Sequence, residues 1–274
     1  MKSIDNMTIL VTGSTDGIGR LVATKLSNLG ARVLIHGRDP EKVTRVMNEI
    51  KEKTGSSKIE GYIADFNALE NVRDLASKIL KNHPNLDVLI NNAGIGLTGK
   101  RKISQDGYEL RFAVNYLAPF LLTHLLIPAL KQGAPSRVVN VSSIGQHTID
   151  FEDIMLEKNF NPQQAYRQSK LALIMFTLDL AERVIDLGIT VNALHPGTYL
   201  DTKMVTEAGI KPMGRAESGA EAEVYLATSP DLNEVSGQYF DVMEKSKAIR
   251  QAYDADARKK LWDLSMKLTG LQES

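Results

Sequence analysis

The 274-residue chain contains no cysteine, which excludes disulfide bonds, thiolate catalysis and cysteine-ligated metals. Its five histidines are scattered and never stand at metal-ligand spacing. Its 33 basic residues balance its 33 acidic residues, so its charge indicates neither nucleic acid nor an anionic membrane as a partner. We therefore expect no metal site and no nucleic-acid partner.

Long apolar runs are also scarce. The N-terminal segment interleaves Ile4, Met7 and Ile9 with polar residues, so it lacks the apolar core of a signal peptide. The most apolar stretch, residues 116–130, carries His124 and two prolines, and on its own it is too short and too broken to span a bilayer. These features predict a cytoplasmic protein without a membrane partner.

Short apolar segments alternate with helical patterns along the whole chain. Strands are predicted over 8–11, 32–36, 59–64, 86–91, 137–142, 188–194 and 237–241, and helices over 20–29, 40–53, 69–83, 107–130, 163–187, 216–227 and 254–268. Pro119 is expected to interrupt or kink the fourth helix. The alternation predicts right-handed βαβ crossovers. We therefore expect an α/β fold: one Rossmann-type domain over 1–274, a doubly wound parallel sheet of about seven strands with helices on both faces and substrate-side loops at about 144–163 and 198–215.

The segment VTGSTDGIG, residues 11–19, connects the first predicted strand to the first helix. Glycines let the backbone approach a pyrophosphate, and a helix N-terminus offers free N–H groups and a positive dipole end. A tight surface turn also collects glycines, so the assignment depends on the motifs that follow. The predicted cofactor-binding residues here are Gly13, Ser14, Thr15, Asp16, Gly17, Ile18 and Gly19.

The second predicted strand is followed by Gly37, Arg38 and Asp39. An acidic residue at the tip of this strand holds the adenosine ribose and repels a 2′-phosphate. A guanidinium instead pairs with that phosphate and stacks on adenine. Arg38 therefore favours NADP(H) over NAD(H), with two alternatives open: Arg38 is only a solvated arginine, or Asp39 takes the ribose.

Further candidates follow the third and fourth strands. Asp65 and Phe66 would contact adenine, or Asp65 simply caps a helix. The small residues of Asn92-Ala93-Gly94 would let a cofactor ribose lie against the backbone, although alone they are an ordinary turn. Asn115 lies in an apolar helix and needs partners. It either satisfies backbone groups or holds a water in a proton path.

Tyr166 and Lys170 are four residues apart on a predicted helix, so they share one face. A nearby ammonium lowers a tyrosine pKa by favouring the phenolate, and such a tyrosine exchanges a proton with a carbonyl or alcohol. A serine hydroxyl, from Ser142 or Ser143, would hydrogen-bond the substrate oxygen. The same spacing alone commonly means two surface residues.

Together these motifs resemble the short-chain dehydrogenase/reductase family over nearly the whole chain: TGSTDGIG (12–19), NNAG (91–94), Asn115, NVSS (140–143), YRQSK (166–170) and the Pro-Gly of LHPG (194–197). The resemblance implies a catalytic tetrad of Asn115, Ser143, Tyr166 and Lys170. Tyr166 would be the general acid/base, and Lys170 would bind the nicotinamide ribose and depress the tyrosine pKa. Ser143, preferred to Ser142, would polarise the substrate oxygen, and Asn115 would hold a relay water.

The resemblance also implies a nicotinamide contact in the segment after the sixth strand. Pro196 and Gly197 match the family pattern, but the gap to Thr202 is one residue longer than is common. Thr198 and Thr202 therefore compete for the contact with the nicotinamide amide.

Extra residues at 144–163, SGQYF at 236–240 and LWDLS at 261–265 resemble the retinol-dehydrogenase-like branch, which acts on lipophilic carbonyls. The resemblance implies an NADP(H)-dependent oxidoreductase interconverting a carbonyl and an alcohol on a lipophilic small molecule. The absence of an expected membrane anchor argues against a retinoid. The predicted pocket residues are those of 144–160 with Tyr199, Leu200, Met204 and Met213.

Two other functions fit the sequence less well. A non-catalytic NADP(H)-binding sensor or scaffold is disfavoured by the complete tetrad, and a nucleotide-sugar epimerase or dehydratase is disfavoured by the glycine spacing. The helices over 116–130 and 163–187 are where the family usually dimerises, which predicts a homodimer or homotetramer.

Overall fold

The structure is a computed structural model that describes residues 2–272. Within that range eight strands form one sheet in the order β3-β2-β1-β4-β5-β6-β7-β8. The strands are β1 Thr8–Val11, β2 Arg32–Gly37, β3 Ile59–Ile63, β4 Val88–Asn91, β5 Ser136–Val141, β6 Ile189–His195, β7 Gln238–Asp241 and β8 Glu244–Ser246. β1 to β7 are parallel and β8 is antiparallel to β7. The predicted doubly wound α/β fold is confirmed, with one strand more than expected.

The additional strand, β8, forms a tight hairpin with β7. Asp241 pairs with Glu244 across the turn, and Val242 within the turn has a φ of +56°. A hairpin turn of this kind normally carries Asn or Gly. Neither residue is present, and all three residues of β8 are exposed, so the sequence offers no apolar alternation that predicts this strand.

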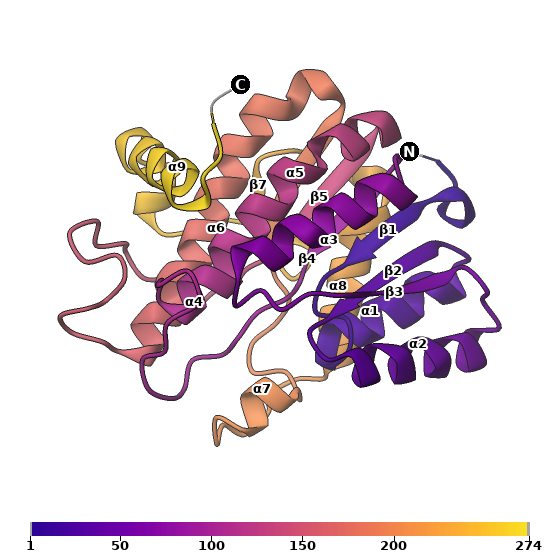
Figure 1. The fold of residues 1–274 in the computed structure, drawn as a ribbon, viewed down its shortest axis with the longest axis horizontal. Coiled ribbons are helices and arrows are strands. Elements are labelled where there is room, and N and C mark those ends of the chain that lie inside the picture. Colours follow the sequence, from indigo (N-terminus) through magenta and orange to yellow (C-terminus); the bar gives the residue numbers. More distant parts are fainter. Residues whose placement is uncertain (1, 273–274) are drawn as a thin grey trace.

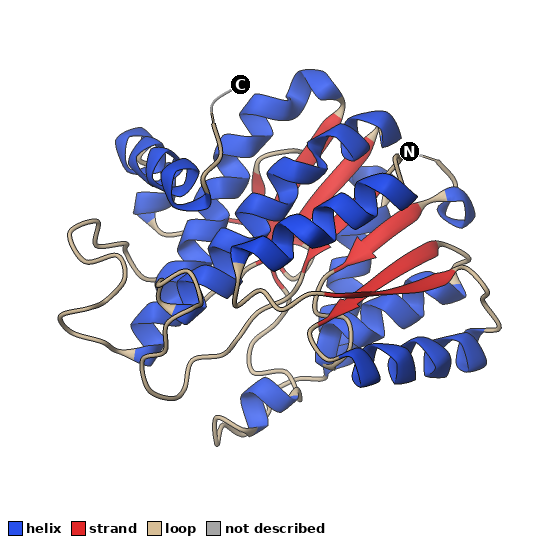
Figure 2. Ribbon diagram, in the orientation of Figure 1, coloured by secondary structure: helices blue, strands red, loops and turns tan. Residues whose placement is uncertain are grey.

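Helices cover both faces of the sheet (Figures 1 and 2). The helices are α1 Gly17–Asn28, α2 Pro40–Thr54, α3 Leu69–Asn82, α4 Leu110–Phe112, α5 Ala118–Gly133, α6 Pro162–Val184, α7 Lys203–Thr206, α8 Ala216–Thr228 and α9 Ala255–Thr269. One face packs against α1, α2 and α8, and the other against α3, α5 and α6, with α9 outside α6. In β1, Leu10 joins the core on the α3–α5–α6 side while Ile9 and Val11 join the other. Strands covered on both faces are apolar throughout for this reason.

The fourth predicted helix is a composite. It begins at Leu110 rather than Gly107, because the Glu109 side chain accepts a hydrogen bond from Phe112 N and so caps α4. The expected interruption near Pro119 is a π segment, Ala113–Leu117, that ends just before this proline. Single-turn π segments inside helices frequently mark functional sites.

The composite helix Leu110–Gly133 has 24 residues and contains an 18-residue window with a mean hydropathy of 1.5, so by length and composition it could cross a membrane. The expectation from residues 116–130 alone, that this stretch is too short, is therefore wrong. In the fold 78% of its most apolar window is buried, and α5 packs against α3, β4 and β5. This is the environment of a core helix.

Candidate active site

The candidate residues meet at the carboxyl edge of the sheet. β1 pairs with β2 on one side and with β4 on the other, so the strand order reverses between β1 and β4. Ligands of open α/β sheets bind at this switch point. The segments after β1, β4, β5 and β6 extend beyond the carboxyl ends of these strands, where α7 projects from the fold (Figure 1).

The glycine-rich turn after β1 has a backbone that requires glycine. Gly13 and Gly17 have φ values of +62° and +48°, in the left-handed region that favours glycine. A Cβ at Gly19 would lie 2.3 Å from Asn92 Nδ2 and 2.6 Å from Gly13 O. The Asp16 side chain accepts from Gly17 N at 2.9 Å and caps α1. The first N–H groups of α1 therefore face the switch point, as an anion site needs.

A buried threonine ties this turn to the segment after β4. The Thr12 hydroxyl oxygen accepts from Asn92 N and from Ala93 N, each at 3.0 Å. The Asn92 amide in turn donates to Thr12 O at 2.7 Å and to Gly13 O at 3.2 Å. Asn92 and Ala93 therefore hold the two segments at a fixed separation.

A buried histidine holds the other side of the turn. His36 Nδ1 accepts from Gly13 N at 3.1 Å, its Nε2 bonds Ala64 O at 3.0 Å, and burial lowers its pKa to about 4. The Ser14 hydroxyl accepts from His36 N at 2.8 Å and is itself fully buried. Phe66, 5% exposed, stacks on the His36 ring at 4.5 Å. The side chains of Ser14 and Phe66, both predicted to bind cofactor, thus pack inside the protein behind the site.

The predicted adenosine end lies at the tip of β2. A Cβ at Gly37 would lie 2.6 Å from Thr15 Cγ2, so Thr15 packs directly over this glycine. Arg38 is exposed, whereas the Asp39 carboxylate accepts from the backbone N–H of the third residue of α2 at 3.1 Å and caps that helix. Asp65 accepts from the backbone N–H two residues later at 3.0 Å, so it also has a capping bond. Among residues 2–272, Arg38 is thus the charged side chain of this tip that makes no capping bond and can reach a phosphate.

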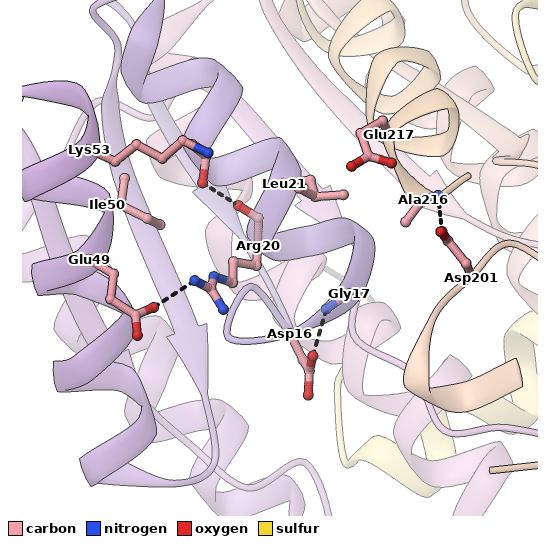
Figure 3. A pocket seen from close by; sticks show the side chains of 11 residues that line it. Asp16, Gly17, Arg20, Leu21, Glu49, Ile50, Lys53, Asp201, Ala216 and Glu217 are labelled. Carbon is pink, nitrogen blue, oxygen red and sulfur yellow. Dashed lines mark hydrogen bonds and ion pairs between the residues drawn. The ribbon is translucent and has the colours of Figure 1, made fainter. Parts of the chain in front are cut away.

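A pocket of about 310 Å³ lies beside the first turn of α1, between α1, α2 and the start of α8 (Figure 3). Its lining mixes the cations Arg20 and Lys53 with four carboxylates, and Arg20 is paired with Glu49 at 2.7 Å. The pocket contains no member of the predicted tetrad. Its clearest structural role is at Asp201, whose carboxylate accepts from Ala216 N and so fastens the 198–215 loop to α8.

Two of the tetrad residues, Asn115 and Lys170, converge beside Gly94. A Cβ at Gly94 would lie 3.3 Å from Asn115 Oδ1 and 3.5 Å from Lys170 Nζ. Lys170 Nζ donates to Val141 O at 2.7 Å and lies 5.8 Å from the Tyr166 ring centroid. Asn115 and Lys170, from the π segment and α6, are therefore brought to one point at the end of β5.

Asn115 is fully buried and makes three hydrogen bonds. Its Oδ1 accepts from Ile95 N at 2.8 Å, and its Nδ2 donates to Ile95 O and to Ser169 Oγ. These bonds hold the chain after β4 against the π segment. The first of the two alternatives, the satisfaction of backbone groups, is confirmed by the bonds to Ile95, and the role of holding a water in a proton path stays a prediction.

The two serines after β5 differ in what they bind. The Ser142 hydroxyl donates to Lys170 O at 2.8 Å, so it anchors α6. Ser143 Oγ accepts from Gly145 N at 3.0 Å, and the Ser143 side chain acts to lower the pKa of the Tyr166 phenol. The geometry therefore separates an anchoring serine from one that faces the tyrosine.

Burial dominates the ionisation of the site. It raises the pKa of Tyr166 above its ordinary value, against the opposing effect of Ser143. It lowers the pKa of Lys170 to about 8. The expectation that the ammonium would leave Tyr166 with a depressed pKa is therefore corrected, because the desolvation of the phenolate is the larger effect here.

The two candidate threonines after β6 have different surroundings. Thr198 Oγ1 bonds His195 Nε2 at 3.0 Å. The Thr202 methyl lies 3.6 Å from a Cβ placed on Gly17, next to the glycine-rich turn. Gly197, just before Thr198, has a φ of +138°. Thr202 is thus the threonine that meets the predicted phosphate-binding segment.

Some apolar residues of the substrate-side loops are buried in the core, and others are exposed. Ile149, Ile154 and Leu156 are buried under the 144–163 loop, and Leu200 packs between glycines 197, 214 and 219, so these residues hold the loops in place. The exposed apolar residues are Ile144, Tyr199, Met204 and Met213. They form the candidate apolar rim of the substrate opening.

One organising pair was not foreseen from the sequence. Arg111 and Glu109 are both buried and lie 3.2 Å apart. Arg111 Nε donates to Gly96 O at 2.8 Å, and its guanidinium lies 5.6 Å from the Phe160 ring centroid. The pair thus joins the segment after β4 to the 144–163 loop, and no sequence pattern distinguishes it from a solvated ion pair.

A nucleotide-binding α/β sheet with a serine, a tyrosine and a lysine at its switch point defines a short-chain dehydrogenase. Comparison with known proteins agrees: residues 7–212 match the short chain dehydrogenase family. The chain belongs to the short-chain dehydrogenase/reductase family of NAD(P)-dependent oxidoreductases, and within it to the retinol-dehydrogenase-like branch.

Its relatives include human retinol dehydrogenase 13, 35% identical over 98% of this chain and 86% of that protein. Human polyprenol dehydrogenase is also 35% identical, over 96% and 84%. Among solved structures, an uncharacterized protein from Mycobacterium paratuberculosis aligns with a TM-score of 0.81 at 30% identity, covering 99% of this chain and 96% of that one. A Shigella flexneri short chain dehydrogenase complexed with NADP aligns at 0.68 and 28% identity, covering 86% and 97%.

Proposed function

We propose that this protein is an NADP(H)-dependent oxidoreductase that interconverts a carbonyl and an alcohol on a lipophilic small molecule, with Tyr166 as the general acid/base. The observation that carries the proposal is the convergence beside Gly94 of Asn115 and Lys170, with the Tyr166 ring centroid 5.8 Å from Lys170 Nζ and its phenol under the influence of Ser143. A phenol placed between a hydroxyl and an ammonium is suited to move a proton to or from an oxygen.

The residues present fit a nicotinamide dinucleotide. The turn at Gly13 and Gly17 presents the N-terminus of α1, and Gly94 leaves room above Asn115 and Lys170 that a Cβ would fill. We assign the diphosphate to residues 13–19 and the 2′-phosphate to the exposed Arg38. The cofactor would supply hydride transfer, and Lys170 with Thr202 would hold its nicotinamide half. The structural relatives include an NADP complex.

The protein's own part is to hold and move the proton. Because burial raises the pKa of Tyr166, the phenol keeps its proton at neutral pH and is ready to donate it to a carbonyl oxygen. Ser143 would hydrogen-bond the same oxygen as negative charge develops on it. We therefore propose that reduction is favoured at neutral pH, while alcohol oxidation, which needs the phenolate, improves as pH rises.

A lipophilic substrate is supported by the rim and by the relatives. Tyr199, Met204 and Met213 are exposed at the loops beyond the site, and methionines suit a deformable apolar pocket. The names of the relatives describe dehydrogenases of retinol and polyprenol, which are apolar alcohols. We therefore propose apolar alcohols and the corresponding carbonyl compounds as the substrate class of this protein.

Location and assembly stay proposals. We propose a cytoplasmic enzyme that forms a homodimer or homotetramer through α5 and α6. α9 already covers part of this face, since Trp262 packs against Phe120, His124 and Phe176. A partner on this face would therefore contact α9 as well, and light scattering with and without residues 255–272 tests this arrangement.

The test is cofactor oxidation by the purified protein, with NADPH and separately NADH, across a panel of apolar aldehydes, ketones and quinones. Turnover with NADPH that is lost in Tyr166→Phe, while cofactor binding is kept, would support the proposal. Strong residual turnover in Tyr166→Phe would overturn the acid/base role. Tight NADPH binding without turnover on the whole panel would favour a non-catalytic sensor.

A further inference from the structure

The chain forms a turn around Ser143 directly after β5. Gly145 N donates to Ser143 Oγ at 3.0 Å, and the Gln146 side chain donates from Nε2 to Ser143 O at 3.1 Å. A hydroxyl that hydrogen-bonds a substrate oxygen must be held within about 0.5 Å of its productive position. Both the backbone and the side chain of Ser143 therefore depend on the conformation of the residues that follow it.

Gln146 also binds a distant part of the chain. Its Oε1 accepts from Ile249 N at 2.9 Å, across 103 residues of sequence. The two ends of one half-buried amide thus connect Ser143 with the C-terminal segment. Because one partner is a backbone acceptor and the other a backbone donor, turning the amide over would set N–H against N–H and oxygen against oxygen. Gln146 therefore has one orientation that satisfies both partners.

Gln251 makes a second connection between the same two segments. Its Oε1 accepts from Ile149 N at 2.6 Å, and its Nε2 donates to Ile149 O at 3.0 Å. Ile149 is buried, so its backbone groups need such partners. The Gln251 amide supplies both of them, as a neighbouring strand would. Residues 143–149 are therefore held to residues 249–251 by the amides of two glutamines.

The C-terminal segment is itself fixed to the body of the protein. Its 3₁₀ turn, Arg250–Tyr253, packs against α6 and leads into α9. Trp262 of α9 is 5% exposed, and the Arg183 guanidinium of α6 lies 3.9 Å from its ring centroid. The Ser265 hydroxyl hydrogen-bonds the Tyr116 hydroxyl of the π segment at 2.6 Å, in a buried position. A segment anchored in this way is a rigid support for the turn after β5.

We propose that Gln146 is a positioning residue for Ser143: its amide transfers the fixed position of the C-terminal segment to the turn that holds the serine hydroxyl. The effect on turnover rests on the proposed function, whereas the effect on the turn does not. The C-terminal segment lies beyond residues 7–212, which match the family model. The connection is therefore additional to the tetrad motif.

The turn is tested without turnover, by amide hydrogen exchange measured by NMR on the full chain. The Gly145 amide reports on its bond to Ser143 Oγ, and the Ile249 amide reports on its bond to Gln146. Gln146→Met keeps the length of the side chain but removes the amide, so we expect both amides to exchange about tenfold faster. Gln146→Glu keeps the acceptor for Ile249 N but loses the donor to Ser143 O, so it should accelerate the Gly145 amide alone.

The control for this experiment is Tyr108→Phe. It removes a 2.9 Å hydrogen bond from the Tyr108 hydroxyl to Leu268 O, at the far end of α9, and should leave the Gly145 amide at its parent rate. A Gly145 amide that stays at the parent rate in both Gln146 variants would overturn the proposal, whatever the protein catalyses. Acceleration of Gly145 in Tyr108→Phe to the same extent would overturn it too, because the turn would then follow general loosening of the segment.

The consequence for catalysis is measured by kcat and KM of carbonyl reduction. Gln146→Met should lower kcat about tenfold and leave the KM of NADPH within about twofold, because it displaces the serine hydroxyl and keeps the cofactor-binding segments. In a Ser143→Ala background the same substitution should have no further effect, because Gln146 acts through Ser143. Equal losses of kcat in the two backgrounds would overturn the role in catalysis. A Ser143→Ala variant with the parent kcat would instead contradict the proposed function of Ser143, which the exchange experiment does not assume.

Discussion

Two buried carboxyl groups in this protein have opposite surroundings. Glu109, at the start of α4, accepts from Phe112 N at 2.8 Å and lies 3.2 Å from Arg111. Glu223, on α8, has neither bond within the described part of the chain. Both are fully buried, and burial raises the pKa of each. The first is compensated by a hydrogen-bond donor and a cation in contact, the second only by the distant charge of Lys170.

The same difference distinguishes polar side chains that are hydrogen-bonded within the protein, and so hold the site together, from those that are left to interact with a ligand. Ser142 is bound to Lys170 O and Thr198 to His195, so these hydroxyls belong to the architecture. Ser143 faces the Tyr166 phenol. A polar group that is already satisfied gains little from a ligand, whereas one left partly unsatisfied gains a full hydrogen bond. Side chains of the second kind are the better candidates for function.

The largest effect should come from breaking the compensated pair. Glu109→Ala leaves Arg111 buried without its carboxylate and removes the cap of α4, so it should destabilise the fold by about 3 kcal/mol. Urea unfolding measures this. The control is Glu157→Ala, which removes the exposed carboxylate 3.9 Å from Arg101 and should cost under about 0.5 kcal/mol. Equal losses in the two variants would remove the distinction between a compensated buried charge and a surface pair.

Removing the uncompensated carboxyl should stabilise the protein. The folded pKa of Glu223 is raised to about 8 from 4.5, so between these values the unfolded chain has released a proton that the folded chain retains. Stability therefore falls as pH rises through this window. Glu223→Gln should be more stable than the parent by roughly 1–3 kcal/mol at pH 8, and the gain should vanish near pH 5. A gain of the same size at both pH values would mean that packing, not ionisation, is responsible.

How far the sequence could predict these features depends on the signal each one leaves. Positions 216, 220, 223 and 227 recur at helical spacing on the buried side of α8, so the sequence itself marks the glutamate as an exception in a stripe of alanines. The glycine-rich turn and the spacing of Tyr166 and Lys170 are local signals, and the structure confirms the strand–turn–helix of the first and the single helix that carries both residues of the second.

Other features depend on contacts between distant segments. His36 Nδ1 accepts a hydrogen bond from Gly13 N, and Arg111 is buried against the chain after β4. The sequence around each of these residues has no pattern that predicts such a contact. The predicted direction of the Tyr166 pKa shift was wrong for the same reason: the burial that raises this pKa depends on the folded environment and not on neighbouring residues in the sequence. The strand β8 was missed because its turn contains Val242 in place of Asn or Gly.

Arg38 is an exposed charge and so gives a third case to set beside the two buried carboxyl groups. Arg38 is solvated, so Arg38→Ala should leave stability within about 0.5 kcal/mol. If Arg38 holds a 2′-phosphate, the variant should weaken NADPH binding about tenfold, or 1.4 kcal/mol, with little change for NADH. Calorimetric titration with both cofactors measures the ratio of the two affinities. The control is Arg45→Ala, which removes an exposed arginine that lies on α2. Equal losses for the two cofactors would remove the phosphate assignment.

The smallest effect should separate the two threonines. Thr198 Oγ1 is bound to His195 at 3.0 Å, whereas the Thr202 hydroxyl has only a 3.4 Å contact with Leu200 O and its methyl lies beside Gly17. The Thr202 hydroxyl is therefore the one that a nicotinamide amide would satisfy. Thr202→Val should weaken NADPH binding by about 1 kcal/mol, roughly fivefold. Thr198→Val keeps the same shape and should leave binding unchanged. The opposite order would show that the longer segment after Gly197 presents Thr198 to the cofactor, and that its bond to His195 opens when the cofactor binds.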